Sequence, residues 1–198
     1  NQLITYALKA GLDGINVDFE SLSEGVGIHF LQFLRELSIQ CHANNLVLSV
    51  DNPVPEDFTS HYDRAEQGKV VDYVIIMGYD EHFAGGAAGS VASLSYVENG
   101  ITDTLEEVPK EKLINSVPLY TRVWTEKDGK TTSKAYGITA AQNWVEENNV
   151  ELTWQDNIGQ YYGEIENENG TQKIWMEETK SLGLKKDLVN KYDLAGIA

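Results

Sequence analysis

Short, nearly continuous apolar segments alternate with segments of helical periodicity along most of the chain, and this alternation limits the folds open to it. Strands are predicted at residues 14–19, 46–50, 70–79, 112–120 and 194–198. Helices are predicted at residues 2–9, 26–44, 62–67, 90–99, 105–108 and 179–192. Largely apolar strands that alternate with helices indicate a parallel sheet covered by helices, so the expected fold class is α/β.

One segment, residues 122–177, interrupts this alternation because it is more polar and richer in Tyr and Trp. Its predicted elements are a helix over 138–148 and a hairpin with strands over 160–165 and 172–177. Asn169-Gly170 marks the hairpin turn, since Asn-Gly suits a tight turn between strands, and we interpret the sequon Asn169-Gly170-Thr171 as that turn. The segment is therefore predicted to be a small α+β insertion. The expected domain portions are a β/α part at 1–121, the insertion at 122–177 and a last helix and strand at 178–198.

The charge balance excludes several kinds of partner. Thirty-one Asp and Glu against 15 Lys and Arg leave a net charge of −16, which repels nucleic acid and anionic membranes. A neutral polysaccharide is compatible with this surface, although solubility alone would also explain it. No apolar run approaches the ~20 residues of a membrane helix, so no membrane insertion is expected. No signal peptide opens the chain, which leaves a cytoplasmic protein or a piece of a longer precursor.

The residues that usually bind cofactors are sparse. Cys41 is the single cysteine, in a predicted helix, and is expected to be a small core residue. The four histidines have no metal-ligand spacing, and neither common nucleotide-binding glycine motif occurs. The sequence predicts no cofactor and no metal.

The sharpest local signal is the segment 13–20, DGINVDFE. Side chains alternate along a strand, so the apolar residues 15, 17 and 19 face one way and Asn16, Asp18 and Glu20 face the other. The two carboxylates are then roughly 7 Å apart at their Cα atoms, from a rise of ~3.3 Å per residue. Such a pair disfavours double ionisation, so one group stays protonated, as a general acid requires. The alternative is an exposed edge strand with a solvated acidic face.

The second signal is the segment 74–80, VIIMGYD. Met77 and Tyr79 share a face of the predicted strand, and Asp80 ends it, where a β/α barrel presents its catalytic loops. A core tyrosine and a helix-capping aspartate are the alternative interpretation.

Together these segments resemble glycoside hydrolase family 18, whose fourth strand carries D-G-x-D-x-D-x-E and whose sixth carries M-x-Y-D. The segment 118–122, PLYTR, is similar to the P-x-Y-G-R of the seventh strand. The resemblance covers nearly the whole chain. It implies a partial TIM (β/α)8 barrel made of strands four to eight, with a small α+β insertion after strand seven. Asn16 in place of Asp, the segment 79–82 (YDEH) and Trp175 look most like the bacterial branch that includes spore-cortex lytic N-acetylglucosaminidases.

The resemblance also implies an activity and a place of action. Members cleave β-1,4 bonds of N-acetylglucosamine polymers, chitin or peptidoglycan, with the substrate's own acetamido oxygen as nucleophile and without a cofactor. Glu20 would be the general acid, Asp18 would orient the acetamido group, and Tyr79 would donate its hydroxyl there. The implied substrate-binding residues are Asn16, Met77, Asp80, Tyr120 and Arg122. The parent protein would be secreted, or associated with the cell wall or the spore.

Asn16 departs from the family pattern. Our hypothesis is that its amide donates to Asp18 and, with one negative charge fewer nearby, holds Asp18 ionised. Replacing Asn16 with Asp should then shift the pH–rate profile.

Two alternatives to the enzyme remain open at this point. One is a non-catalytic, lectin-like barrel of the same family, although lectin-like relatives usually lose the acid that Glu20 represents. The other is a scaffold whose acidic row binds a divalent cation, although calcium wants six to eight oxygen ligands. An open partial barrel would also expose sheet edges, through which the chain could self-associate. The aromatic residues of the insertion could stack on sugars or build its core; they are Trp124, Trp154, Tyr161, Tyr162 and Trp175.

Overall fold

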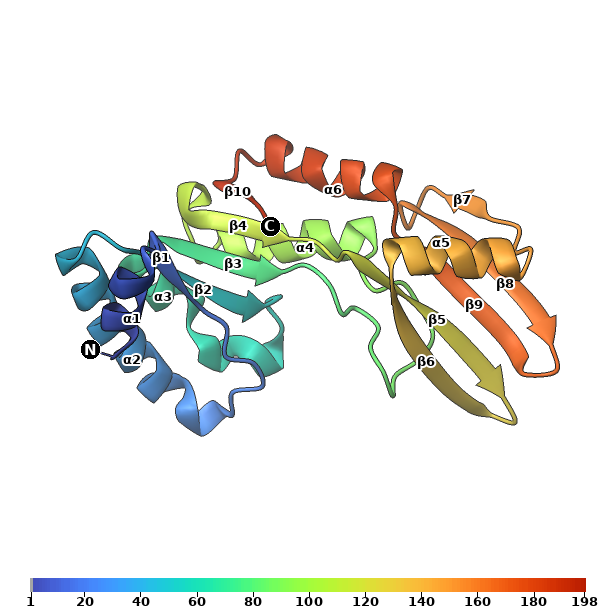
Figure 1. The fold of residues 1–198 in the computed structure, drawn as a ribbon, viewed down its shortest axis with the longest axis horizontal. Coiled ribbons are helices and arrows are strands. Elements are labelled where there is room, and N and C mark those ends of the chain that lie inside the picture. Colours follow the sequence, from blue (N-terminus) through green and yellow to red (C-terminus); the bar gives the residue numbers. More distant parts are fainter. Residues whose placement is uncertain (1) are drawn as a thin grey trace. The chain divides into compact units, whose positions relative to one another are not determined.

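The computed structural model describes residues 2–198, which form two compact units (Figure 1). The first unit comprises the chain up to Met77 together with Gly100–Ser116 and Val189–Ala198. The second comprises Gly78–Asn99 and Val117–Leu188. The sequence predicted a different division, into a β/α part, an insertion and a last helix and strand. These two units do not test that division, which stays a prediction.

The first unit is built on a parallel sheet with the strand order β1-β2-β3-β4-β10. Its strands are β1 (Gly14–Val17), β2 (Val47–Pro53), β3 (Tyr73–Met77), β4 (Leu113–Ser116) and β10 (Gly196–Ile197). All five were predicted from their apolar character, and their parallel pairing confirms the α/β interpretation. Within residues 2–198, β1 and β10 are the two edges, so this sheet is not closed into a barrel.

Helices separate the strands in sequence. They are α1 (Gln2–Ala10), the 3-10 turn η1 (Glu24–Val26), α2 (Gly27–Ala43), η2 (Asp57–Tyr62), α3 (Arg64–Val70), α4 (Leu94–Leu105), η3 (Lys110–Lys112) and α6 (Thr179–Lys191). The predicted helix over 90–99 corresponds to α4, which begins later than predicted, whereas the predicted helix over 105–108 overlaps α4 only at Leu105, its last residue. Cys41 on α2 is fully buried, as expected of a core residue.

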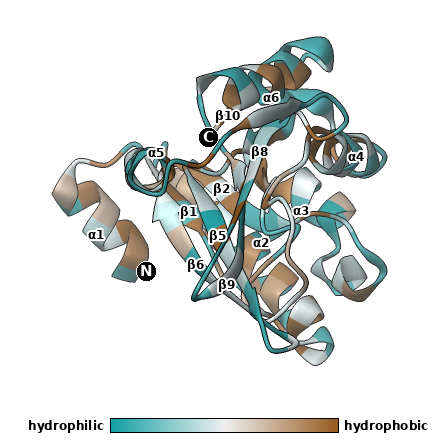
Figure 2. Cartoon of the chain, turned by 90° about the vertical axis from the view of Figure 1, so that its right-hand side faces the viewer, coloured by the Kyte–Doolittle hydropathy of each residue, from teal (hydrophilic) through white to brown (hydrophobic). Residues whose placement is uncertain are grey.

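The two faces of the parallel sheet differ in burial. The side chains that face the helices are the core of the unit, and Leu48, Val50, Val74, Ile76 and Leu113 are fully buried. The intervening side chains on the other face are only partly buried or exposed, as the strand patterns of β1, β2 and β3 show. Figure 2 shows the mixed hydropathy of β1 and β2. Any polar chemistry in this unit therefore has its place on the second, open face.

The second unit is built on an antiparallel sheet with the order β6-β5-β9-β8-β7. Its strands are β5 (Tyr120–Lys127), β6 (Lys130–Gly137), β7 (Thr153–Gln155), β8 (Gln160–Asn167) and β9 (Gly170–Met176). The helix α5 (Ile138–Glu147) packs on the sheet through a core of Val123, Ala141, Ile174 and Met176. The predicted helix and the hairpin around Asn169-Gly170 are confirmed, since Asn167 pairs with Gly170 across the turn.

A buried ion pair lies in this second unit. Lys185 Nζ donates to Glu177 Oε1 at 2.7 Å, and neither residue has measurable exposure. Ser181 and Gln160 also donate to the Glu177 carboxylate, and Ser90 donates to Gln160. Burial raises the pKa of Glu177, and the Lys185 cation and these hydrogen bonds oppose that shift. The Lys185 cation and these hydrogen bonds therefore favour the ionised form of a carboxyl that burial alone would disfavour.

Gly27, at the start of α2, approaches neighbouring backbone too closely for any side chain. A Cβ there would lie 2.2 Å from the carbonyl oxygen of His61. We expect Gly27→Ala to lower the free energy of unfolding by about 1–3 kcal/mol, because backbone rather than a flexible side chain must move. Denaturant titration measures this loss. Gly25→Ala is the matched control, since a Cβ at Gly25 meets nothing within 4 Å; equal losses in the two variants would contradict the prediction.

None of the helices within residues 2–198 has the length and apolarity needed to span a membrane.

Candidate active site

The acidic motif lies where β1 ends. Asn16 is exposed on the open face and Val17 is buried beneath the helices, as the predicted alternation requires. The strand ends at Val17, two residues earlier than predicted, so Asp18 and Glu20 lie on the segment that follows and are exposed. Phe19 leaves the opposite way, with its ring 5.8–5.9 Å from two phenylalanine rings of α2, although it is half exposed. The carboxylates are accessible to a ligand.

The amide of Asn16 does not serve Asp18, so that part of our hypothesis is wrong. Both of its hydrogens are donated to the neighbouring strand β2: to Ser49 Oγ at 2.9 Å and to Asp51 Oδ1 at 2.9 Å. The parallel register explains this, because Asn16 pairs with Ser49 and Asp51 follows on the same face. Asn16 is therefore a bridge between β1 and β2.

Asp51 is a half-buried carboxylate that the sequence interpretation missed. Burial raises its pKa, the hydrogen bond from Asn16 opposes that rise, and the negative charge of Asp18 adds to it. The signal was present in the sequence, since the alternation along 46–50 continues to Asp51 and puts it on the face of Asn16. The sheet thus gathers Asn16, Asp18 and Asp51 at the carboxyl end of β1 and β2.

Met77 ends β3 on the same open face. It pairs with Pro53 at the end of β2 and with Ser116 at the end of β4, and it is half-buried. Carboxyl ends of parallel strands meet at one edge of a sheet, which is where β/α folds carry their active sites. Of the predicted site residues, this first unit therefore holds Asn16, Asp18, Glu20 and Met77.

Three other predicted residues come together in the second unit. The hydroxyl of Tyr120 donates to Asp80, and the rings of Tyr79 and Tyr120 meet edge to face with centroids 6.3 Å apart. Asp80 has a positive φ of 62°, so its backbone is held in a left-handed conformation. Burial, the hydrogen bond to Asp80 and the Asp80 charge all raise the pKa of Tyr120, which therefore stays a hydrogen-bond donor at neutral pH.

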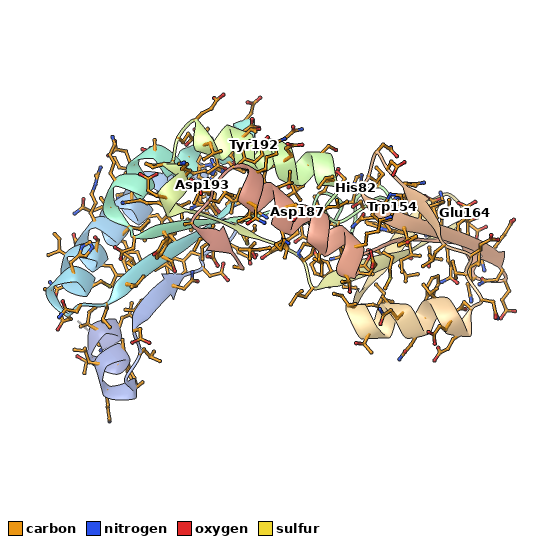
Figure 3. The ribbon with its side chains drawn as sticks, turned by 90° about the horizontal axis from the view of Figure 1, so that it is seen from above. His82, Trp154, Glu164, Asp187, Tyr192 and Asp193 are labelled. Carbon is orange, nitrogen blue, oxygen red and sulfur yellow. The ribbon has the colours of Figure 1, made fainter. Side chains whose placement is uncertain are left out.

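The loop that carries Asp80 is fixed by hydrogen bonds involving side chains of its own residues and Trp124 of β5. Glu81 accepts from the backbone N–H of Ser93 at 2.7 Å and from its hydroxyl at 3.0 Å. His82, labelled in Figure 3, donates from Nδ1 to the carbonyl of Ser90 at 2.8 Å. The indole N–H of Trp124 donates to the carbonyl of Gly89. These bonds order a loop that has no regular secondary structure.

Arg122 lies on β5. Its Nη1 donates to Ser133 Oγ at 3.2 Å, whereas its Nε is buried with no hydrogen-bond partner in the part of the chain that the structure describes. A buried N–H without a partner is costly, so this guanidinium has capacity for a further acceptor.

The aromatic residues of the second unit divide between core and surface. Trp124 is fully buried and Tyr161 packs against the core cluster, so a sugar-stacking role for Trp124 is wrong. Trp154, labelled in Figure 3, has its ring face occupied by Lys180 at 3.4 Å. Tyr162 and Trp175 are half-buried, with ring centroids 4.8 Å apart. Tyr162 and Trp175 thus form an aromatic pair that is only partly buried.

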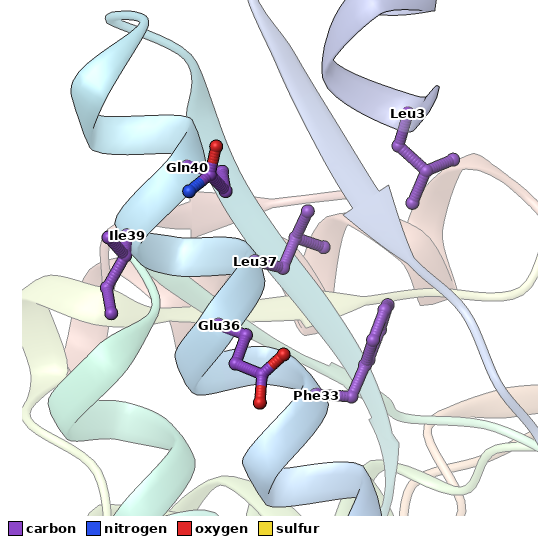
Figure 4. A pocket seen from close by; sticks show the side chains of 6 residues that line it. All are labelled: Leu3, Phe33, Glu36, Leu37, Ile39 and Gln40. Atoms are coloured by element: carbon purple, nitrogen blue, oxygen red, sulfur yellow. The ribbon is translucent and has the colours of Figure 1, made fainter. Parts of the chain in front are cut away.

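A pocket of about 420 Å³ lies elsewhere in the first unit, between α1 and α2 (Figure 4). Leu3 of α1 and residues of α2 line it; they are Phe33, Glu36, Leu37, Ile39 and Gln40. This lining is mostly apolar and contains none of the predicted site residues. Within residues 2–198, no three His, Cys, Asp or Glu side chains lie together so as to hold a metal ion.

Comparison with known proteins matches residues 1–198 to the family model for Glycosyl hydrolases family 18. Among curated proteins, the chain is 26% identical over 205 residues to the uncharacterized glycosylase YvbX of Bacillus subtilis, covering all of this chain and 59% of that protein. It is also 26% identical over 207 residues to the cortical fragment-lytic enzyme of Bacillus subtilis, covering all of this chain and 48% of that enzyme. The chain thus spans about half to three fifths of the length of these relatives.

Solved structures show the same likeness. A chitinase from Chromobacterium violaceum superimposes with a TM-score of 0.91 at 27% identity, over 98% of this chain and 63% of that one. The spore cortex-lytic enzyme SleL of Bacillus cereus superimposes with a TM-score of 0.87 at 26% identity, over 98% of this chain and 46% of that one. The fold is therefore α/β and TIM-barrel-like.

Proposed function

Because the chain belongs to glycosyl hydrolases family 18, we propose that it forms part of an enzyme that cleaves β-1,4 bonds in N-acetylglucosamine polymers. The observation that carries the proposal is the accessible row of Asn16, Asp18 and Glu20 at the carboxyl end of β1. The partners would be chitin or the glycan strands of peptidoglycan. Relatives named as cortical fragment-lytic and spore cortex-lytic enzymes favour peptidoglycan as the first substrate to test, and a protein located at the cell wall or spore.

The proposed reaction is substrate-assisted and retains the anomeric configuration. Glu20 gives its proton to the glycosidic oxygen while the bond from that oxygen to the anomeric carbon breaks. The acetamido oxygen of the same sugar forms a new bond to the anomeric carbon, giving a positively charged oxazolinium ring. Glu20, now ionised, takes a proton from water as the water oxygen attacks the anomeric carbon, and the ring opens.

The remaining roles follow from the same proposal. Asp18 accepts a hydrogen bond from the acetamido N–H and stabilises the positive charge of the intermediate. In the second unit, Tyr79 donates to the acetamido group, and Asp80, Tyr120 and Arg122 bind the sugar. The Arg122 Nε, which has no hydrogen-bond partner among residues 2–198, supports a ligand acceptor there. Asn16 and Met77 are assigned to substrate binding.

We also propose how the sheets correspond to the family barrel. β1, β2, β3, β4 and β10 would be barrel strands four to eight, and the antiparallel sheet an insertion after strand seven. Self-association through the free edges of the parallel sheet stays a prediction.

The test is release of reducing ends from spore-cortex muropeptides and from chitooligosaccharides by the full-length protein. The Glu20→Gln variant is the blank. We expect release from at least one substrate, above this blank, and the better substrate identifies the polymer. Equal, background-level signals from both proteins with glycan binding intact would replace the hydrolase with a lectin-like function.

A further inference from the structure

We propose that Asp51 is a positioning residue of this site, forming with Asp18 a carboxylate pair whose shared proton Asp51 holds. The inference rests on the proposed glycosidase function and adds to it a residue on a different strand from the acidic motif. It begins from the bridge between β1 and β2, which fixes the position of Asp51 relative to the motif.

The bridge leaves Asp51 one oxygen for a second partner. Asn16 donates one amide hydrogen to Asp51 Oδ1 and the other to Ser49, so it has no hydrogen left for Asp18. A protonated Asp51 would still accept the Asn16 hydrogen at Oδ1, and its other oxygen would then carry an O–H. Val17 pairs with Val50, so the next residue, Asp18, follows on the side of Asp51, and its carboxylate is the acceptor that we infer for this hydrogen.

The surroundings of Asp51 decide which carboxyl keeps the proton. Asp51 faces Asn16 from β1 and pairs with Ile75 of β3, so neither neighbouring strand brings a cation to it. Among residues 2–198, the charge that acts on Asp51 is that of Asp18. Half-buried beside a like charge, Asp51 has its pKa raised, whereas Asp18 is exposed. Asp51 is therefore the member of the pair that holds the proton.

The pair makes the site sensitive to pH in a specific way. While Asp51 is protonated, Asp18 has a hydrogen-bond donor beside it. When Asp51 ionises, this donor is replaced by a second negative charge, and Asp18 is repelled from its position. We therefore expect kcat/KM to fall several-fold as pH rises through the ionisation of Asp51.

The first arm of the experiment needs no turnover. The Asp51 side-chain carboxyl is titrated by carbon-13 NMR in the full-length protein and in its Asp18→Asn variant. We expect the Asp51 midpoint to fall by about half a pH unit or more when the Asp18 charge is removed. Asp13→Asn is the matched control, because Asp13 precedes the opposite end of β1, and it should leave the midpoint unchanged.

The second arm compares the pH dependence of kcat/KM in the parent protein and in Asp51→Asn. Asparagine keeps the acceptor for Asn16 and offers a neutral donor at every pH, so the ionisation seen at the Asp51 midpoint should vanish from its profile. An Asp51 midpoint that Asp18→Asn does not move overturns the pair. A moved midpoint with identical profiles in the two proteins overturns its role in the site. An inactive parent protein with a moved midpoint would overturn the glycosidase function instead, so the two failures are distinguishable.

Discussion

Replacing Glu20 with Gln is expected to lower kcat roughly 10²–10⁴-fold, the usual contribution of a positioned general acid. Glutamine has the same shape but no proton to give to the glycosidic oxygen and cannot later accept one from water. Glu20 is exposed and follows the end of β1, so its replacement should not disturb the core of the unit. Steady-state kinetics on the better substrate measures the loss, and the thermal unfolding midpoint should stay that of the parent protein.

Glu24→Gln is the matched control for this prediction. Glu24 is an exposed glutamate four residues further along, in η1, and has no assigned role. Its replacement removes the same charge from the same segment, so kcat should change little. Comparable losses in both variants would mean that acidity of the segment, rather than proton transfer by Glu20, supports activity.

The second large effect concerns stability. Lys185→Met should lower the free energy of unfolding by about 3–5 kcal/mol at neutral pH, because it leaves the Glu177 carboxylate buried without its cation. The loss should shrink as pH falls. Without the cation, the folded-state pKa of Glu177 rises further above its unfolded value, so the folded state binds more protons than the unfolded state between these two values. Stability then increases towards low pH. Denaturant unfolding at several pH values checks both points.

Two further variants isolate the cause. Lys186 is the next residue on α6 but is exposed, and its ion pair with Asp187 (labelled in Figure 3) is a surface pair. Lys186→Met should therefore leave unfolding unchanged. Glu177→Gln combined with Lys185→Met removes both charges and should recover part of the loss. Equal losses of unfolding free energy in Lys185→Met and Lys186→Met would mean that the buried ion pair contributes no more to stability than the surface pair.

The parallel sheet could be predicted because its strands are short apolar segments, which the sequence distinguishes from the longer segments of helical periodicity. The ends of the strands could not be predicted, because they depend on which neighbouring strand each residue pairs with. β1 stops at Val17, the last residue that pairs with β2, although the apolar alternation continues to Phe19. β3 likewise ends at Met77, where its pairing with β2 and β4 ends.

The hairpin of β5 and β6 was missed for a different reason. β6 is polar and largely exposed, so it carries no apolar signal, and Tyr120 was assigned to the preceding strand. Asp128-Gly129, a turn dipeptide with both residues at positive φ, was the signal that could have found it. Polar edge strands are recognised by their turns rather than by their burial.

The sequence predicted the site residues that lie on one continuous segment. It missed the residue whose place in the site depends on the pairing of two strands. Asn16, Asp18 and Glu20 follow from alternation along a single strand. Asp51 is 35 positions from Asn16, and their contact depends on the register between β1 and β2, which the sequence does not state. The same register explains why Asn16 donates to β2 rather than to Asp18.

Asn16 connects β1 to β2 through side chains as well as backbone, and the segment bearing Glu20 continues directly from β1. Any local opening that separates β1 from β2 must therefore break the two Asn16 side-chain bonds together with the backbone pairing, which raises the free energy of that opening. The Asn16 bonds thus couple the position of the acid Glu20 to the local stability of β1.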